Sequence, residues 1–219
     1  MKRFKIFTIL SLFAVLFTLC SCDDHEPIDA NIYPGYILTT DHRIMSLNEF
    51  QSSSHVNAEG VIYALANEKH PMLVVLLDEV EEVQFADSLY SQGTSADVMA
   101  FDGFVNTTQL QNSYDAKTFH GSPLGKRVIE YQSFGQSAYI PSVAEMNTLL
   151  AVAKTVNHSL EAIGATPIKT EEDCWYWTST EVESNKNNQA WLLSGASGSY
   201  QPTVKTECHR ARPIISIYY

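Results

Sequence analysis

The order of hydrophobic and polar positions predicts a chain that forms strands, then helix, then strands again. Short apolar and β-prone stretches occupy residues 35–38, 60–65 and 72–77. The third stretch is continuously apolar, which is typical of a strand buried on both faces. After the helical region, aromatic and β-branched segments alternate with Asn-, Gly- and Ser-rich turns, which predicts an antiparallel meander. Its segments are residues 175–180, 190–193, 198–200 and 213–217.

The most clearly predicted helix begins just after Ser142. The Ser142 side chain can cap it, and Glu145 can reach back to complete a capping box. Apolar residues then recur at three- and four-residue steps as far as Ile163, so we interpret this stripe as a core face. Gly164 can adopt the left-handed conformation that ends a helix, and a further helix or a loop begins at Asp102. This order of elements indicates an α+β fold class rather than alternating α/β units.

The first 21 residues have the layout of an export signal. Three basic residues within positions 1–5 precede an apolar stretch at 6–19, which is too short to span a bilayer as a mature helix. The end of this segment resembles a lipobox, in which Cys22 would be acylated and become the new N-terminus, with Cys20 as the competing position. An ordinary cleaved signal or a membrane anchor helix is the alternative interpretation.

The charge of the chain excludes several classes of partner. The net charge is −11, and it becomes −14 without residues 1–21, because these hold three basic residues and no acidic one. Nucleic acids and anionic lipid headgroups need a basic surface, so neither is an expected partner. With 45% hydrophobic residues, the remainder suits one domain with a substantial core. We therefore expect a signal peptide at 1–21, a lipid-anchored tether at 22–34 and one domain at 35–219.

Four motifs in the second half of the chain resemble a known family. They lie at residues 139–145, 175–181, 190–191 and 210–214, in the order in which the family has them. Residues 139–219 are similar to Legionella collagen-like C-terminal (DUF1566) domains. Residues 35–138 are less similar to these domains. The resemblance implies a C-type-lectin-like mixed domain with two helices and antiparallel sheets, in which the N- and C-terminal strands pair. It also implies that the segment before the last strand recognises the ligand.

The recognition surface that this resemblance implies covers residues 183–188 and 194–205. Both stretches carry amide, hydroxyl or aromatic side chains that suit a protein or glycan ligand, and solvated turns are the alternative interpretation. Trp175, Trp177 and Trp191 can stack on sugar rings or pack in the core, and their positions favour packing. The candidate ligand-binding residues are Asn185, Asn187, Asn188, Tyr200, Gln201 and Lys205.

Two cysteines, Cys174 and Cys208, remain after the signal region. In an exported protein such a pair is most simply a disulfide, and two separate buried thiols or a reactive thiol are the alternatives. Lectin-type calcium binding needs an acid beside a proline, but Thr203 follows Pro202, so we expect no metal and no cofactor. Motifs for nucleophilic, metal-dependent or phosphate chemistry do not occur in the sequence, and we do not expect an enzyme.

These features together predict a lipid-anchored binding protein of the cell envelope. Acyl chains on Cys22 would attach it to the membrane, and several chains together anchor a protein persistently. Asp23 and Asp24 resemble an acidic signal that sends lipoproteins to the outer cell surface, with the periplasmic face as the alternative. The expected location is thus the outer membrane, and the expected ligand is a protein or a glycan. A structural subunit of a surface polymer is the alternative function, and an envelope enzyme is the least favoured.

Overall fold

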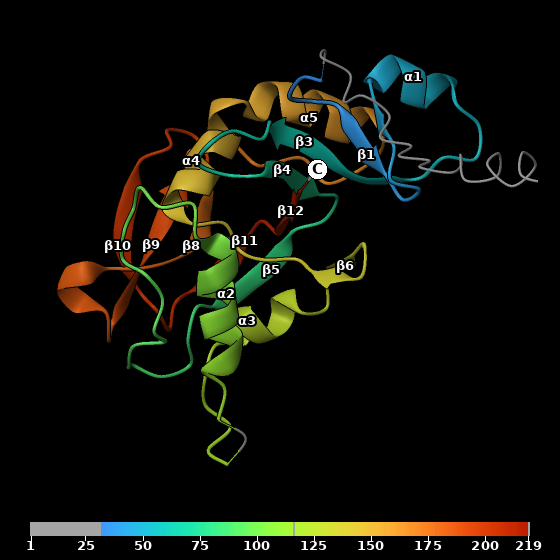
Figure 1. The fold of residues 1–219 in the computed structure, drawn as a ribbon. Coiled ribbons are helices and arrows are strands. Elements are labelled where there is room, and N and C mark those ends of the chain that lie inside the picture. The colour runs from blue at the N-terminus through green and yellow to red at the C-terminus, as the bar shows by residue number, and fades with distance from the viewer. Residues whose placement is uncertain (1–31, 116, 219) are drawn as a thin grey trace, which may run out of the picture. The chain divides into compact units, whose positions relative to one another are not determined.

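The computed structural model describes residues 32–115 and 117–218, in which helices mix with mainly antiparallel strands (Figure 1). The α+β fold class is therefore confirmed. The expected signal peptide, the acylation site at Cys22 and most of the tether lie outside the described residues. Within the described ranges, no helix is both long enough and apolar enough to cross a membrane.

The first sheet contains the earliest and the last strands of the described chain. Its strands are β1 (Ile37–Thr39), β2 (Ile44–Met45), β3 (Ala58–Ala64), β4 (Met72–Leu76) and β12 (Ile214–Ile217). The strand order is β12-β4-β3-β1-β2, and every pair is antiparallel. Val75 of β4 lies opposite Val61 of β3 on one side and Ile214 of β12 on the other. The expected pairing of the N- and C-terminal strands is wrong, because β3 and β4 lie between β1 and β12.

The second sheet carries the first three segments of the predicted meander, whereas the fourth, at residues 213–217, forms β12 in the first sheet. Its strands are β5 (Val80–Gln84), β8 (Trp175–Glu181), β9 (Gln189–Ser194), β10 (Tyr200–Val204) and β11 (Cys208–Ala211). The order is β10-β9-β8-β11-β5, and consecutive strands β8, β9 and β10 pair antiparallel, as predicted. The β11 strand runs parallel to β8, with Arg210 opposite Tyr176. A separate short hairpin joins β6 (Gln132–Ser133) to β7 (Gln136–Ser137).

The resemblance implies two helices, whereas the described residues contain five α-helices. They are α1 (Leu47–Ser52), α2 (Gly103–Asn112), α3 (Pro123–Val128), α4 (Val143–Ala151) and α5 (Ala153–Ala162), with a 3-10 turn at Glu183–Asn185. The α1 and α3 helices are too short to produce a recognisable apolar period. The capping box between Ser142 and Glu145 is confirmed, as is the left-handed Gly164, whose φ is +74°. The predicted single helix is interrupted at Val152, which separates α4 from α5.

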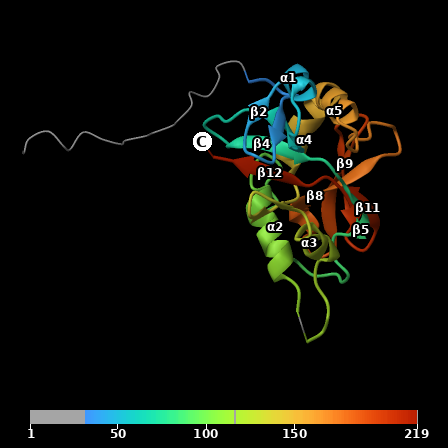
Figure 2. The ribbon, with the colours of Figure 1, turned by 90° about the vertical axis from the view of Figure 1, so that its right-hand side faces the viewer.

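Two apolar clusters lie on opposite faces of the strands. Along β8, Tyr176 belongs to one cluster and Trp177 to the other, as the two-residue period of a strand requires. Leu149 of α4 packs on the Tyr176 side, and Leu110 of α2 packs on the Trp177 side, so the helices cover different faces (Figure 2). The Trp177 indole N–H donates to the Val83 carbonyl at 2.9 Å. This tryptophan is therefore a core residue and not a stacking platform for sugars.

Candidate functional site

The expected recognition surface, residues 183–188 and 194–205, comprises the turn between β8 and β9, the end of β9, the turn after it and β10 (Figure 1, orange). The antiparallel register places Pro202 opposite Trp191 and Tyr200 opposite Leu193. The rings of Trp191 and Tyr200 meet edge to face, with centroids 5.1 Å apart and planes at 89°. Trp191 is half-buried, whereas Tyr200 is 47% exposed and Gln201 is also exposed. One face of the second sheet thus presents the Trp191–Tyr200 aromatic pair, and Gln201, the next residue along β10, points to the opposite face.

The β10 strand lies at the edge of its sheet and has one open side. The N–H of Ser194 donates to Ser199, and the N–H of Lys205 donates to Asn188, so the odd-numbered residues of β10 bond toward β9. The even-numbered residues, including Pro202, therefore direct their backbone groups away from the sheet. Proline has no N–H to donate, so it weakens this edge as a template for another strand. Recognition at β10 then depends on side chains rather than on strand addition.

The turn before β9 uses most of its amides on itself. The Asn188 side chain donates to Asn185 Oδ1 at 2.6 Å, and the Asn185 side chain donates to Gln189 Oε1 at 3.2 Å. Both asparagines are half-buried, whereas Asn187 is exposed. Asn185 and Asn188 therefore shape the turn, and Asn187 is the asparagine that it presents to solvent.

The expectation that Lys205 binds ligand directly is wrong. Its side chain is 0% exposed and forms an ion pair with Glu181, which is also 0% exposed. The ammonium group also donates to Gln92 Oε1 at 2.8 Å, to the Tyr90 carbonyl at 3.0 Å and to the Lys186 carbonyl. The period of β10 accounts for this placement, because Lys205 follows buried Thr203 by two positions and faces inward with it.

The buried ion pair joins three segments that are distant in the sequence. Besides Lys205, the Glu181 carboxylate accepts hydrogen bonds from Ser91 Oγ at 2.9 Å and from the Gln92 N–H at 2.7 Å. Burial lowers the pKa of Lys205, and the neighbouring Glu181 carboxylate opposes this shift. The contacts hold residues 90–92 and 186 against the end of β10. Buried Lys205 therefore holds the turn that carries Asn187 in place, which favours a preorganised binding surface.

Neither protein-family models nor curated proteins provide a relative for this chain: no family model matches it, and no curated protein is similar to it. Within residues 32–115 and 117–218, no three His, Cys, Asp or Glu side chains are grouped so that they could hold a metal ion.

The two cysteines do not form the expected disulfide. Cys174 and Cys208 are both free thiols in the structure. Cys174 is buried in the apolar cluster beside Tyr176, and burial raises the pKa of its thiol. Cys208 is exposed at the start of β11. The pair thus consists of one core residue and one surface residue, an arrangement that cysteine count alone does not distinguish from a disulfide.

A second buried acid, Glu145, lies apart from this surface at the start of α4. Its carboxylate accepts the Ser142 N–H at 2.7 Å, and the residue is only 3% exposed. Burial raises the pKa of Glu145 to about 7. Burial also raises the pKa of Tyr63 and of Tyr139, and the nearby charge of Glu145 adds to both shifts. The capping pattern predicts the position of Glu145, but its burial depends on the packing of distant segments.

Proposed function

We propose that this protein is a lipid-anchored binding protein of the cell envelope, with a C-type-lectin-like domain of the DUF1566 type. It recognises a protein or glycan through β9, β10 and the turn before them. The observation that supports this assignment best is the exposed Tyr200 ring, which meets Trp191 edge to face. Exposed aromatic rings suit both sugar rings and protein surfaces. The resemblance at residues 139–219 supports the lectin-like assignment.

Attachment and location are proposed from the N-terminal segment. Acyl chains on Cys22 would hold the protein at the outer membrane, and Asp23 and Asp24 support the outer cell surface over the periplasmic face. Feeding cells a labelled fatty acid tests the attachment. We expect label on the wild type and none on Cys22→Ala. Label that persists on Cys22→Ala, or that is absent from the wild type, would contradict it.

The binding proposal is tested with glycan and protein arrays probed with the exported part, residues 23–219. We expect a reproducible ligand, and we expect Tyr200→Ala to weaken its binding about tenfold or more, because a central aromatic contact commonly contributes that much. Tyr33→Ala is the matched control, since Tyr33 is also an exposed tyrosine but precedes β1. The proposal fails if no surface material binds, or if both substitutions affect binding equally.

A further inference from the structure

The buried Lys205 ammonium group lies against a side-chain amide as well as against an acid. Its Nζ atom donates to Gln92 Oε1 at 2.8 Å and to the Glu181 carboxylate. Gln92 is only 4% exposed, and Lys205 and Glu181 are fully buried. Because Oε1 is bonded to Cδ, this contact also holds Nζ beside the carbonyl carbon of Gln92. An amine, an amide and a carboxyl group therefore meet in one site away from solvent.

The amide nitrogen of Gln92 is in a less favourable environment than its oxygen. Gln92 Nε2 is buried, and no group among the described residues accepts a hydrogen bond from it. The opposite orientation of the amide would place this donor against the Lys205 ammonium group, so the orientation is fixed. A buried donor without a partner destabilises the folded state, and such atoms are uncommon in native proteins. Loss of this nitrogen from Gln92 would therefore remove an unfavourable group.

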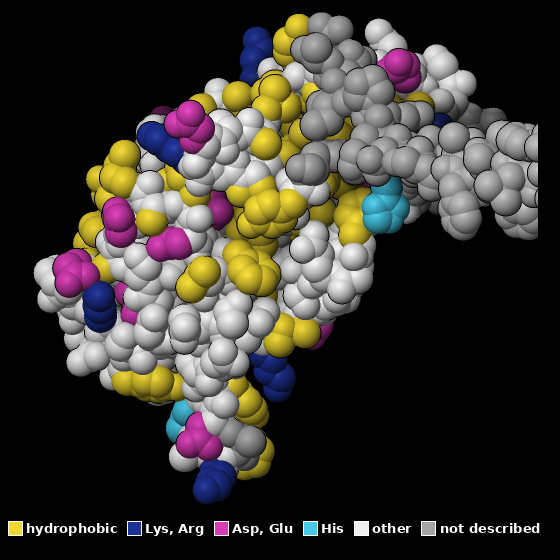
Figure 3. Space-filling model, viewed as in Figure 1, with side chains coloured by type: hydrophobic (Ala, Val, Ile, Leu, Met, Phe, Trp, Pro, Cys, Tyr) yellow, Lys and Arg dark blue, Asp and Glu magenta, His cyan; other side chains and the backbone are white. Residues whose placement is uncertain are grey.

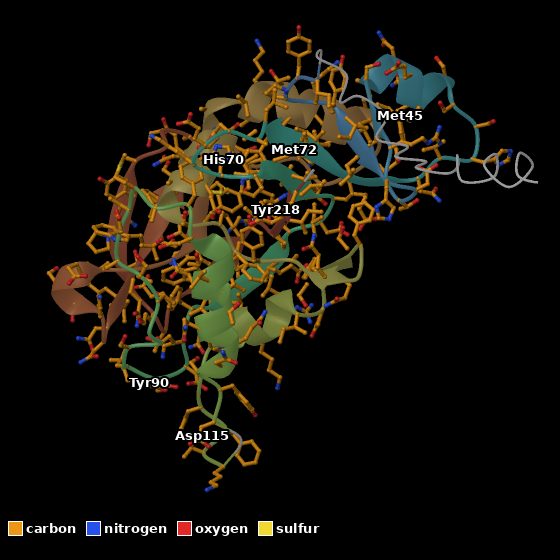
Figure 4. The ribbon with its side chains drawn as sticks, in the orientation of Figure 1. Met45, His70, Met72, Tyr90, Asp115 and Tyr218 are labelled. Carbon is orange, nitrogen blue, oxygen red and sulfur yellow. The ribbon has the colours of Figure 1, made fainter. Side chains whose placement is uncertain are left out.

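The connection between β5 and α2, residues 85–102, closes this site from solvent. The Tyr90 carbonyl accepts a hydrogen bond from Lys205 Nζ at 3.0 Å, and the Tyr90 hydroxyl donates to the Ser113 carbonyl at 3.2 Å. The Tyr90 ring is exposed, and Figure 3 shows hydrophobic side chains on the surface at the place where Figure 4 labels Tyr90. Burial lowers the pKa of Lys205, which favours its neutral and nucleophilic amine. Exclusion of water also protects a new amide bond from hydrolysis.

From this geometry we infer that Lys205 and Gln92 react to form an intramolecular isopeptide bond, with Glu181 as the acid–base catalyst. Glu181 takes a proton from the ammonium group, and the Nζ lone pair of the resulting amine attacks Cδ of Gln92. Glu181 passes this proton to Nε2, the Cδ–Nε2 bond breaks and ammonia leaves. The second proton that Nζ loses stays on the Glu181 carboxyl group. An amine and an amide thus become a new amide and ammonia, and a buried ion pair becomes two uncharged groups, which burial favours.

The bond joins two segments that are 113 positions apart in the sequence. A cross-link that closes so long a loop strongly restricts the unfolded chain, so it opposes unfolding. The two cysteines of the described residues provide no such link, because both are free thiols. Only the unlinked chain keeps the Lys205 ammonium group and its ion pair with Glu181, so stability effects of that pair refer to the unlinked chain. This cross-link goes beyond the proposed ligand binding and does not depend on it.

Peptide mass spectrometry of the full-length protein tests the bond. The protein is purified from cells in a mild detergent, kept folded for several days, then denatured and digested with trypsin. We expect the peptides that contain Gln92 and Lys205 to be joined, with their summed mass reduced by one ammonia molecule and with fragment ions that place the link at these two residues. Separate, unmodified peptides, or a link from Lys205 to a different residue, would overturn the inference.

Variants test the role of each group, and protection of Cys174 from a thiol reagent shows that a variant is folded. Gln92→Leu keeps the ion pair but lacks the reacting carbonyl, so it should form no link. Glu181→Gln cannot accept the proton, so the link should form about a hundredfold more slowly or not at all. Gln132→Leu is the control and should link as the wild type does, since Gln132 is an exposed glutamine of the β6–β7 hairpin. A Lys205 cross-link that persists in Gln92→Leu, or that forms at the wild-type rate in Glu181→Gln, would refute the mechanism. The peptides of the wild type decide whether the bond exists even where a variant fails to fold.

Discussion

Glu145→Gln should remove a specific dependence of stability on pH. The described part of the chain contains two capping boxes, Ser46 with Glu49 and Ser142 with Glu145. At the exposed box, hydrogen bonds from Ser46 lower the pKa of Glu49. At the buried box, loss of solvation outweighs the hydrogen bonds from Ser142 and raises the pKa of Glu145 to about 7. The same local motif therefore has opposite electrostatic consequences in two environments.

The size of the effect follows from the shift in pKa. An increase from 4.5 to about 7 corresponds to about 3 kcal/mol, since one pKa unit is worth about 1.4 kcal/mol. Folding favours the protonated acid, so the folded state binds more protons than the unfolded state between these two pH values. This contribution to stability is complete below about pH 4.5 and is lost as the pH rises through about 7. Because Glu145 is only 3% exposed, solvent screens the effect little.

The assay is urea denaturation at pH 5 and pH 8. Between these values the free energy of unfolding of the wild type should fall by about 2–3 kcal/mol relative to that of Glu145→Gln. Glutamine can still complete a capping box, so the variant keeps the helix start while it removes the titrating group. Glu49→Gln is the control and should keep the pH dependence of the wild type. An equal pH dependence in the wild type and Glu145→Gln would refute the reasoning.

Two further predictions concern other buried groups. Lys205→Met should lower the free energy of unfolding by about 3–5 kcal/mol, because it leaves the Glu181 carboxylate buried without its partner. Adding Glu181→Met should recover much of this loss, as measured by denaturant titration. If the double variant is no more stable than Lys205→Met, the unpaired Glu181 carboxylate is not the cause of the lost stability. A thiol reagent should modify Cys208 in the native protein and Cys174 only after unfolding, as read by mass spectrometry. Equal native labelling of both thiols would contradict the assigned burial.

Local features of the fold were predictable because their causes lie within a few residues. The start of α4 depends on Ser142 and Glu145, three positions apart, and the end of the stripe depends on Gly164. Strands β8, β9 and β10 follow from short aromatic and β-branched runs separated by turn residues. The two-residue strands and the six-residue helices offer too few positions for a period to emerge. The break at Val152 has no Gly or Pro beside it that would predict it.

The sequence by itself determined the fold class and the β8-β9-β10 meander, because short strand-forming runs and the turns between them are local patterns. Only the tertiary structure decided that β12 pairs with β4, that Lys205 is buried and that the two thiols are separate. These outcomes depend on contacts between segments far apart in the chain, as where residues 90–92 meet the end of β10. No local pattern encodes such contacts, since whether a polar side chain is exposed depends on which distant segment packs over it.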